Sequence, residues 1–317
     1  MVMRKAFRKF LYLLATFHYP LVKKDYRYFI RDNYYSRSRQ LKYVIKDYLL
    51  KTRYKNIKFQ GEFDQELRYV IPFAYWHHLN GTLNKTISCK NTKEFYFFSD
   101  HHEEKHEQRI WELGYSNFEM PNMTHSASFS YRKWVQVPFK SQYKNDIYVY
   151  EKPILVIANK YNIEWDDAPL NFFSISLLEW IINKYSSKYQ IIYNRPLNSQ
   201  IVADNSDNLD LNEHQWLKDN YPEVIQLNDL YHQKSAEVQN FNHLQLMVYA
   251  NCDFFVSAHG GTAALASYFG GHNTILSKRG IEHDLNEFKT IFPALSGAKI
   301  HHAKSDLDVQ GYLEKYY

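Results

Sequence analysis

Cysteine, glycine and proline are scarce in this chain of 317 residues, which contains 2, 10 and 9 of them respectively. The two cysteines, Cys89 and Cys252, form no C-x-x-C pair and no metal-ligand spacing. A disulfide framework is therefore disfavoured, and a reducing compartment fits the chain better. The low glycine and proline content argues against long disordered tracts. Hydrophobic residues make up 45% of the chain, and the length suits two domains of ordinary size.

The N-terminal region lacks a long hydrophobic run. Its most apolar stretch, Phe10 to Phe17, is eight residues long, whereas a bilayer span needs about 20. No A-x-A pattern that would suit cleavage of a signal peptide follows it. We therefore expect neither a transmembrane segment nor a signal peptide, and we predict a cytoplasmic protein.

Positive charge is concentrated at the N-terminus. Residues 1–58 contain 16 Lys or Arg against 3 Asp or Glu, whereas the remaining residues contain 23 against 31. We predict a basic helical extension over residues 1–56, for which two interpretations stay open. Either its Tyr, Leu and Phe face packs on the body, or it is a peripheral anchor on the cytoplasmic face of an anionic membrane. Nucleic acid is disfavoured as a partner, because no recognition motif is present and the body is acidic.

The next part of the chain, residues 57–150, shows a weaker α/β pattern that we interpret as an acceptor-side domain. Pro72 is expected to interrupt its first helix, and the irregular sequence over 121–150 is expected to contain the domain boundary. The predicted elements are a strand ending at Gly61, a helix as far as Val70, a strand over 94–100 and a polar helix over 101–114 closed by Gly114.

Residues 151–317 alternate regularly between apolar strands and amphipathic helices. Strands that are apolar throughout, separated by helices, indicate parallel βαβ units with helices on both faces. We therefore predict an α/β fold of two Rossmann-like domains, the C-terminal one a doubly wound parallel sheet. Its predicted strands cover 154–158, 189–196, 223–227, 253–258 and 273–277, and its predicted helices cover 171–188, 214–222, 242–252 and 262–270.

The stretch FFVSAHGGTAALASYFGG (254–271) places His259-Gly260-Gly261-Thr262 between a strand and a helix. In a doubly wound sheet, ligands bind outside the carboxyl ends of the strands. A helix start offers unpaired N–H groups to a phosphate, glycine allows close approach, and Thr262 can cap or donate its hydroxyl. The alternative is a tight turn without a ligand. The loop is neither G-x-G-x-x-G nor a Walker A motif, which weighs against dinucleotides and NTP hydrolysis.

Three other predicted strand ends carry polar residues suited to an anion or a ribose. An arginine there can pair with a phosphate in bidentate fashion, and a carboxylate can accept hydrogen bonds from a ribose diol. The alternative for Arg195 is a surface salt bridge. We predict that these residues share one edge of the sheet: Asn159, Lys160 and Glu164, then Asn194 and Arg195, then Lys278 and Glu282.

This arrangement resembles the GT-B class of nucleotide-sugar glycosyltransferases, in which two Rossmann-like domains hold the donor mostly in the C-terminal one. In that class an H-G-G or similar turn lies near the donor diphosphate, and a Glu after the next strand holds the ribose. The His259-Gly260-Gly261 turn and Glu282 match those positions. Three stretches, FFVSAHGGTAALASYFGG, ANKYNIEW and IIYNRP, are also similar to bacterial and viral polysaccharide glycosyltransferases. The resemblance covers Lys152 to Ile300.

The segment GEFDQEL resembles a loop of fucosyltransferase-like enzymes, but Asp64 stands where those enzymes have a second glycine. We therefore do not assign the donor or acceptor contacts of those enzymes to Gly61 and Glu66. The fucosyltransferase His-x-Arg-Arg pattern is also absent, with Tyr-Asn-Arg-Pro in its rough place. No fucosyl donor is implied.

The resemblance implies transfer of a hexose or deoxyhexose from a UDP- or GDP-sugar to a glycan or lipid-linked acceptor. The product would be a surface polysaccharide such as lipopolysaccharide, O-antigen or capsule. It also implies no metal and no further cofactor, so His259, Arg195 and the glycine amides would stabilise the leaving diphosphate. A non-catalytic nucleotide-sugar-binding module of a polysaccharide assembly complex is the alternative.

An inverting enzyme of this kind also needs a base for the acceptor hydroxyl. The first candidates follow the predicted strand over 94–100, and the second set lies in the GEFDQEL segment. In order of preference they are Asp100, His101 and His102, then Asp64 and Glu66, then His77 and His78.

The segment DHHEEKHE allows a third interpretation, a zinc hydrolase. His102 and His106 are spaced i,i+4 with Glu103 between them, formally an H-E-x-x-H motif. A zincin helix is amphipathic, whereas this segment is almost wholly charged, and no third ligand follows at the expected distance. We therefore favour a solvated helix here, and we interpret the acidic DNSDNLD and WDD segments as loops.

Overall fold

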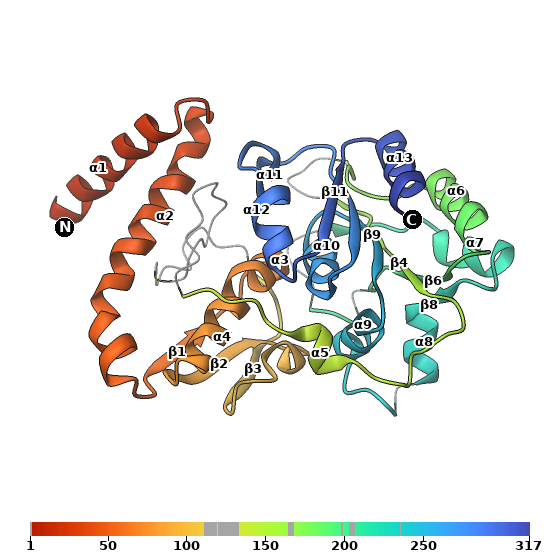
Figure 1. Cartoon of the computed structure of the whole chain (residues 1–317), viewed down its shortest axis with the longest axis horizontal. Coiled ribbons are helices and arrows are strands. Elements are labelled where there is room, and N and C mark those ends of the chain that lie inside the picture. Colours follow the sequence, from red (N-terminus) through yellow and green to blue (C-terminus); the bar gives the residue numbers. More distant parts are fainter. Residues whose placement is uncertain are drawn as a thin grey trace.

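The computed structural model describes residues 2–110, 119, 133–163, 168–197, 199–202, 207–234 and 236–317. Figure 1 shows a helical hairpin at the N-terminus beside a body in which helices surround β-sheets. Two of the sheets are parallel, with three and six strands, and a short antiparallel ribbon lies outside them. The chain is therefore an α/β protein, as its alternating pattern predicts.

The larger sheet has the strand order β11-β10-β9-β4-β6-β8. The chain adds β6 and β8 on one side of β4, then returns to its other side with β9 and continues outward. This is the strand order of a Rossmann sheet, with its switch point between β4 and β9. The strands are β4 (Ile154–Ala158), β6 (Gln190–Asn194), β8 (Ile225–Gln226), β9 (Phe254–Ala258), β10 (His272–Leu276) and β11 (Lys299–Ala303), with β5 (Asn162–Ile163) and β7 (Asp207–Asn208) in the ribbon.

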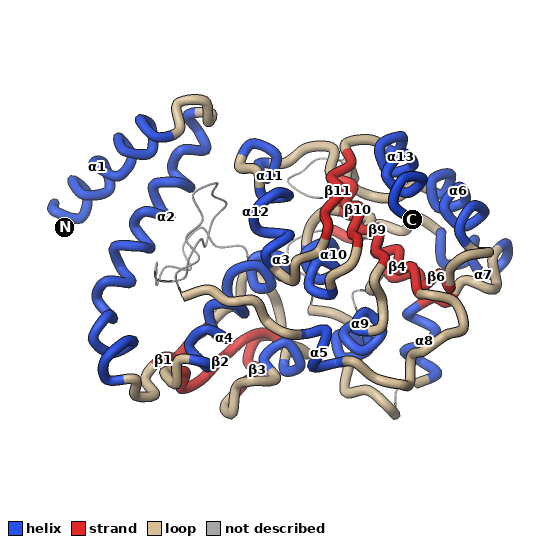
Figure 2. Tube along the Cα trace, viewed as in Figure 1, coloured by secondary structure: helices blue, strands red, loops and turns tan. Residues whose placement is uncertain are grey.

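Successive residues of these strands enter two apolar cores, one on each face of the sheet. Leu155 and Ile157 join a core with α6, α7 and α13, whereas Val156 and Ala158 join a core with α8, α9, α10 and α12. Figure 2 shows these helices on both sides of the strands. The predicted doubly wound sheet is confirmed, and burial on both faces explains its uniformly apolar strands.

From residue 139 onward, the helices in chain order are α5 (Phe139–Tyr143), α6 (Ile175–Tyr185), α7 (Glu213–Asn220), α8 (Leu227–Gln233), α9 (Phe241–Ala250), α10 (Gly261–Ala266), the 3₁₀ helix η6 (Ser267–Phe269), α11 (Ile281–Asp284), α12 (Glu287–Ala294) and α13 (Asp306–Tyr316).

The smaller sheet corrects two predictions. Its edge strand β3 (His102–His106) occupies part of a segment predicted to be a helix, whose predicted end at Gly114 lies outside the described residues. The apolar run predicted as a strand over 94–100 instead forms the 3₁₀ helix η5 (Lys93–Tyr96) and a loop. Phe95, Tyr96 and Phe98 are buried, so the run is apolar because its rings fill the core. The other strands are β1 (Lys55–Lys58) and β2 (Leu83–Cys89).

The helix after β1 continues through Pro72, contrary to the sequence prediction. It runs through α3 (Phe63–Gln65), a π-helical turn η4 (Glu66–Val70) and α4 (Ile71–Leu79). Pro72 follows directly on the π-helical turn, and the carbonyl of Arg68, four positions earlier, accepts a hydrogen bond of 2.8 Å from Nε1 of Trp134 in place of the N–H that proline lacks.

The basic extension is helical, as predicted. Helices α1 (Val2–His18) and α2 (Arg27–Gln40) pack on each other. Its end is joined to the body by buried ion pairs, in which Lys133 contacts Asp47 and Glu119, and Glu119 also contacts Lys55. The remaining elements are η1 (Lys24–Tyr26), η2 (Leu41–Tyr43) and the π-helix η3 (Ile45–Leu50).

The two halves of the body share an apolar core. Ile57 and Phe59 near β1 belong to the same buried cluster as Phe255 of β9. Tyr268 also donates a hydrogen bond to the carbonyl of Leu67 in η4. The halves therefore pack closely on each other, and the division into domains near residue 150 stays a prediction.

Candidate active site

The switch point between β4 and β9 is where a sheet of this topology binds ligands. Asn159 and Lys160 follow β4 there, and the His259-Gly260-Gly261 turn follows β9. The carboxyl end of the smaller sheet meets the same place, because α3, which follows β1, contacts α10. The candidate site therefore lies where the two sheets bring their strand ends together.

A different steric constraint favours glycine at each of the two positions, Gly260 and Gly261. Gly260 has a φ of +124°, and a Cβ there would lie 3.3 Å from Nζ of Lys160. A Cβ at Gly261 would lie 2.8 Å from Cδ1 of Phe63 in α3. The backbone N–H groups of Gly260, Gly261 and Thr262 donate to no described backbone carbonyl. The turn therefore offers amide donors beside a lysine ammonium, and the N-terminal unit packs against it.

Thr262 closes the turn from within. Its hydroxyl donates a hydrogen bond of 2.6 Å to the carbonyl of Ala258, so its proton is already used. Helix α10, which begins here, is only 6 residues long. The turn can therefore stabilise an anion through its amides rather than through the dipole of a long helix.

His259 is buried at the centre of the site, with 7% of its surface exposed. Its Nε2 lies 3.7 Å from Oε1 of Glu282, and its ring packs against Phe288. Burial lowers the pKa of His259 to about 4, although Glu282 and Asp64 act in the opposite direction. The imidazole is therefore neutral at physiological pH, and its Nε2 has no hydrogen-bond partner within the described residues.

Asp64 brings a carboxylate from the N-terminal unit to the same place. One of its oxygens, Oδ2, pairs with Arg68, and the other, Oδ1, is buried without a hydrogen-bond partner in the described part of the chain. Arg68 is wholly buried and also pairs with Glu287 at the start of α12. The guanidinium holds the Asp64 carboxylate in position and joins the two units of the site.

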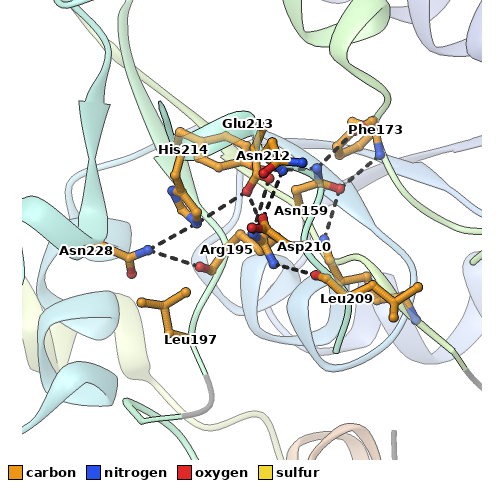
Figure 3. A network of polar contacts seen from close by, with 12 residues as sticks. Asn159, Phe173, Arg195, Leu197, Leu209, Asp210, Asn212, Glu213, His214 and Asn228 are labelled. Atoms are coloured by element: carbon orange, nitrogen blue, oxygen red, sulfur yellow. Dashed lines mark hydrogen bonds and ion pairs between the residues drawn. The ribbon is translucent and has the colours of Figure 1, made fainter. Parts of the chain in front are cut away.

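Arg195, predicted to bind a phosphate, is engaged elsewhere. Figure 3 shows its guanidinium against the carboxylate of Glu213 in α7. Nη2 of Arg195 lies 3.2 Å from Oε2 of Glu213, and Nη1 donates to the carbonyl of Leu209 at 3.2 Å. Oδ1 of Asp210 lies 3.6 Å from the same Nη2. Two carboxylates therefore balance this cation, and it does not join the group around His259.

Asn159 and Asn194 hold the loops of the sheet together. Asn159 donates to the carbonyl of Phe173 at 3.1 Å and accepts from the backbone N–H of the same residue at 2.9 Å, as Figure 3 shows. Asn194 donates to Gln245 and to the hydroxyl of Tyr249 in α9. Both side chains are fully buried in these networks, so they shape the site without facing a ligand.

The two residues predicted to reach the site after β10, Lys278 and Glu282, lie in different places in the structure. Glu282 lies beside His259, as the prediction of a shared edge requires. Lys278 turns outward, where its Nζ lies 3.5 Å from Asp306 of α13. Glu164 lies outside the described residues.

The first three base candidates lie at the wrong end of their strand. Because β3 begins at His102, Asp100 and His101 stand at its amino end, away from the strand ends that form the site. Asp100 forms an exposed ion pair of 2.8 Å with Arg53. His102 is held between the hydroxyls of Thr86 and Thr92, at 2.8 and 3.2 Å. Of the base candidates, Asp64 lies close enough to His259 to raise the pKa of its imidazole.

The weaker base candidates serve the structure of the N-terminal unit. Glu66 is buried and bonded to Tyr96 at 2.8 Å and Arg109 at 2.7 Å. Burial lowers the pKa of His77 to about 2, and its Nδ1 lies 2.7 Å from the hydroxyl of Thr82. His78 is exposed on α4.

The strand also separates the two histidines of the H-E-E-K-H segment. Residues four apart on a strand are roughly 13 Å apart, so His102 and His106 do not chelate one ion as they would on a helix. Across the residues with described positions, no three His, Cys, Asp or Glu side chains gather in a metal-binding group.

Sequence reasoning missed Arg68, Glu287 and Phe63 as residues of the site. Arg68 and Glu287 are separated by 219 positions in the chain, so no local pattern joins them. The available signal was the spacing of Asp64 and Arg68, which is i,i+4 on a helix and suits an ion pair.

No protein-family model matches the sequence, and no significant relative is found among curated proteins. Two solved structures are similar in fold. One, the E. coli ADP-heptose lipopolysaccharide heptosyltransferase II, is 10% identical, with a TM-score of 0.48 over 82% of this chain and 96% of that chain. The other, an E. coli heptosyltransferase with ADP, is 11% identical, with a TM-score of 0.35 over 89% and 78%. Both are described as heptosyltransferases, and a likeness at this level of identity and TM-score assigns no activity, residue or substrate here.

Proposed function

We propose that this protein is a glycosyltransferase that moves a sugar from a nucleoside-diphosphate donor to a glycan or lipid-linked acceptor in the synthesis of a surface polysaccharide. One observation carries the proposal. At the switch point of a Rossmann sheet, amide donors and a lysine meet a buried neutral histidine and a carboxylate from the opposite unit. Such a site can hold a diphosphate and place a base across from it.

The donor half of the site is built from the turn and its neighbours. The N–H groups of Gly260 and Gly261 and the ammonium of Lys160 would stabilise the charge that develops on the leaving diphosphate. His259 would donate a further hydrogen bond from its neutral ring. We assign the ribose diol to Glu282, which lies next to His259. A UDP- or GDP-sugar, used without a metal, stays our prediction for the donor.

The acceptor half rests on Asp64. Its Oδ1 would take the proton from the acceptor hydroxyl as that oxygen attacks the anomeric carbon and the bond to the diphosphate breaks. Arg68 would fix the other carboxylate oxygen, so that the free oxygen points in one direction. A single displacement of this kind inverts the anomeric centre.

Replacement of Asp64 tests this assignment. We expect Asp64→Asn to lower the rate of donor cleavage by about 100-fold or more, the usual contribution of a general base. The rise in melting temperature on adding the donor nucleotide should persist, because the turn is unchanged. Asp100→Asn is the matched control, since this carboxylate lies on the surface, and it should keep the wild-type rate.

Two results would go against the proposal. If Asp64→Asn keeps a rate within tenfold of wild type, Asp64 is not the base. If the wild-type protein binds nucleotide but releases none from any donor, with or without saccharide acceptors, the alternative of a non-catalytic binding module is correct.

A further inference from the structure

The N-terminal hairpin, defined as residues 2–50 from α1 to η3, exposes an unusual amount of apolar surface. On α1 the exposed fractions are 88% for Met3, 53% for Phe10, 81% for Phe17 and 98% for the following Leu21. Leu21 lies in the turn after α1, whereas at 3.6 residues per turn Met3, Phe10 and Phe17 fall within about 40° of one another around the helix axis. They form a single apolar stripe that no described segment covers.

The opposite side of α1 is already packed. Leu11 and Ala15 are buried, with 6% and 0% of their surface exposed, and α1 contacts α2. Arg8 forms an ion pair of 3.1 Å with Asp32 of α2. The apolar stripe is therefore not the face through which α1 packs on α2, and its side chains do not hold the hairpin together.

A second apolar stripe lies nearer the body, between residues 41 and 49. Its members repeat at the helical spacing i, i+3, i+4, i+7, i+8, whereas Asp47 between them points inward to Lys133. They are exposed by 40% or more, and they are Leu41, Val44, Ile45, Tyr48 and Leu49.

Basic residues accompany both stripes. Lys5 and Lys9 are exposed on α1, and Lys42 and Lys46 are exposed beside the second stripe. Over residues 1–58 the chain has 16 Lys or Arg against 3 Asp or Glu. Large apolar side chains set among lysines match the two layers of a lipid interface, the acyl boundary and the anionic head groups.

We propose that the N-terminal hairpin docks on the surface of an anionic phospholipid bilayer, with the α1 stripe entering the interface and the exposed lysines of the hairpin contacting head groups. Within the described residues, no helix combines the length and apolar character needed to cross a bilayer. The docking is therefore peripheral. This inference goes beyond the proposed function and does not depend on it.

Co-sedimentation of the full chain with vesicles tests the proposal. We expect binding to vesicles that contain phosphatidylglycerol, little binding to pure phosphatidylcholine, and weaker binding as salt is raised. Phe10→Ser with Phe17→Ser should lower partitioning by roughly tenfold for each phenylalanine. Lys5→Gln with Lys9→Gln should lower it by about fivefold for each charge.

Matched controls come from the opposite end of the molecule. Leu307 on α13 is 77% exposed, so Leu307→Ser removes an equally exposed apolar side chain and should leave partitioning unchanged. Lys144→Gln removes an exposed lysine of the body and should also have no effect. All variants change exposed side chains, so their melting temperatures should stay close to that of the wild type.

Three results would overturn the proposal. The first is equal partitioning of the Phe10/Phe17 variant and the Leu307 control. The second is binding to neutral and anionic vesicles alike, or to neither. The third is self-association of the wild type that the phenylalanine changes abolish, without vesicle binding, which would make the stripe an interface between copies of the chain.

Discussion

Replacing Arg68 by methionine examines the joint between the two units of the site. Arg68 is wholly buried and pairs with Asp64 and Glu287, whose side chains are 15% and 0% exposed. In Arg68→Met, Glu287 would keep the hydroxyl of Tyr69 at 3.3 Å as a partner, but both carboxylates would lose the guanidinium that they share. Removing one partner of a buried ion pair costs about 3–5 kcal/mol.

For a chain of 317 residues that loss corresponds to a fall in melting temperature of about 5–8 °C, because the unfolding entropy grows with chain length. Thermal melting followed by circular dichroism is a suitable assay. Arg53→Met is the matched control, because Arg53 and Asp100 form an exposed pair with 59% and 61% of their side chains accessible. It should change the melting temperature by less than about 2 °C.

A double variant separates loss of the pair from loss of packing. If loss of the shared cation beside a buried carboxylate causes the instability, Arg68→Met with Glu287→Gln should melt higher than Arg68→Met alone. The reasoning is refuted if Arg68→Met melts within about 2 °C of the wild type, or if the second change lowers stability further.

Two further predictions follow from buried titratable groups. Because burial lowers the pKa of His259 to about 4 from an ordinary value near 6.5, the unfolded chain binds its proton first on acidification. The wild type should therefore lose about 3 kcal/mol more than His259→Asn between pH 7 and pH 4 in urea titrations, and equal losses would contradict this. Burial also raises the pKa of the thiols, to about 11 for Cys89 and about 12 for Cys252. Ellman's reagent at pH 8 should label neither in the native protein and both in guanidinium, whereas rapid native labelling would show that they are accessible.

The C-terminal half could be predicted from sequence because its strands are buried on both faces. Ile154–Ala158 and Phe254–Ala258 are apolar runs between amphipathic helices, and a parallel sheet is the fold that buries such strands. The predicted His-Gly-Gly turn followed directly, since a strand end and two glycines are adjacent in the chain. The last strand, Lys299–Ala303, went unpredicted because it lies at the edge of the sheet and carries lysine and two histidines.

The N-terminal half was harder to predict because its apolar pattern does not follow its strands. The aromatic run at 94–98 fills the core from a 3₁₀ helix and a loop, whereas the charged segment His102–His106 pairs as an edge strand. Edge strands often carry charges that prevent pairing with other chains. Because of this error, the prediction put Asp100 and His101 at the carboxyl end of a strand, whereas they lie before the amino end of β3.

The pairing of Arg195 with a carboxylate could not be predicted, for a different reason. A bidentate arginine at a strand end suits a phosphate and a carboxylate equally well. The carboxylate of Glu213 lies 18 positions away in the chain, and only the packing of α7 on the sheet brings the two together.

A thermal-shift screen with UDP, GDP, CMP, ADP and dTDP, each with Mn²⁺ or EDTA, tests the central claim most directly. A ligand that binds only the folded chain raises the melting temperature. We expect one nucleotide to give a clear shift that EDTA does not change. Gly260→Ala should abolish the shift, because Gly260 has a φ of +124° and lies against Lys160.

Gly297→Ala is the control for backbone strain, since Gly297 has a φ of +83° with open space around its Cβ position. It should lower the melting temperature yet keep the nucleotide shift. No shift with any nucleotide, or an equal shift in Gly260→Ala, would contradict a donor site at the switch point of the sheet.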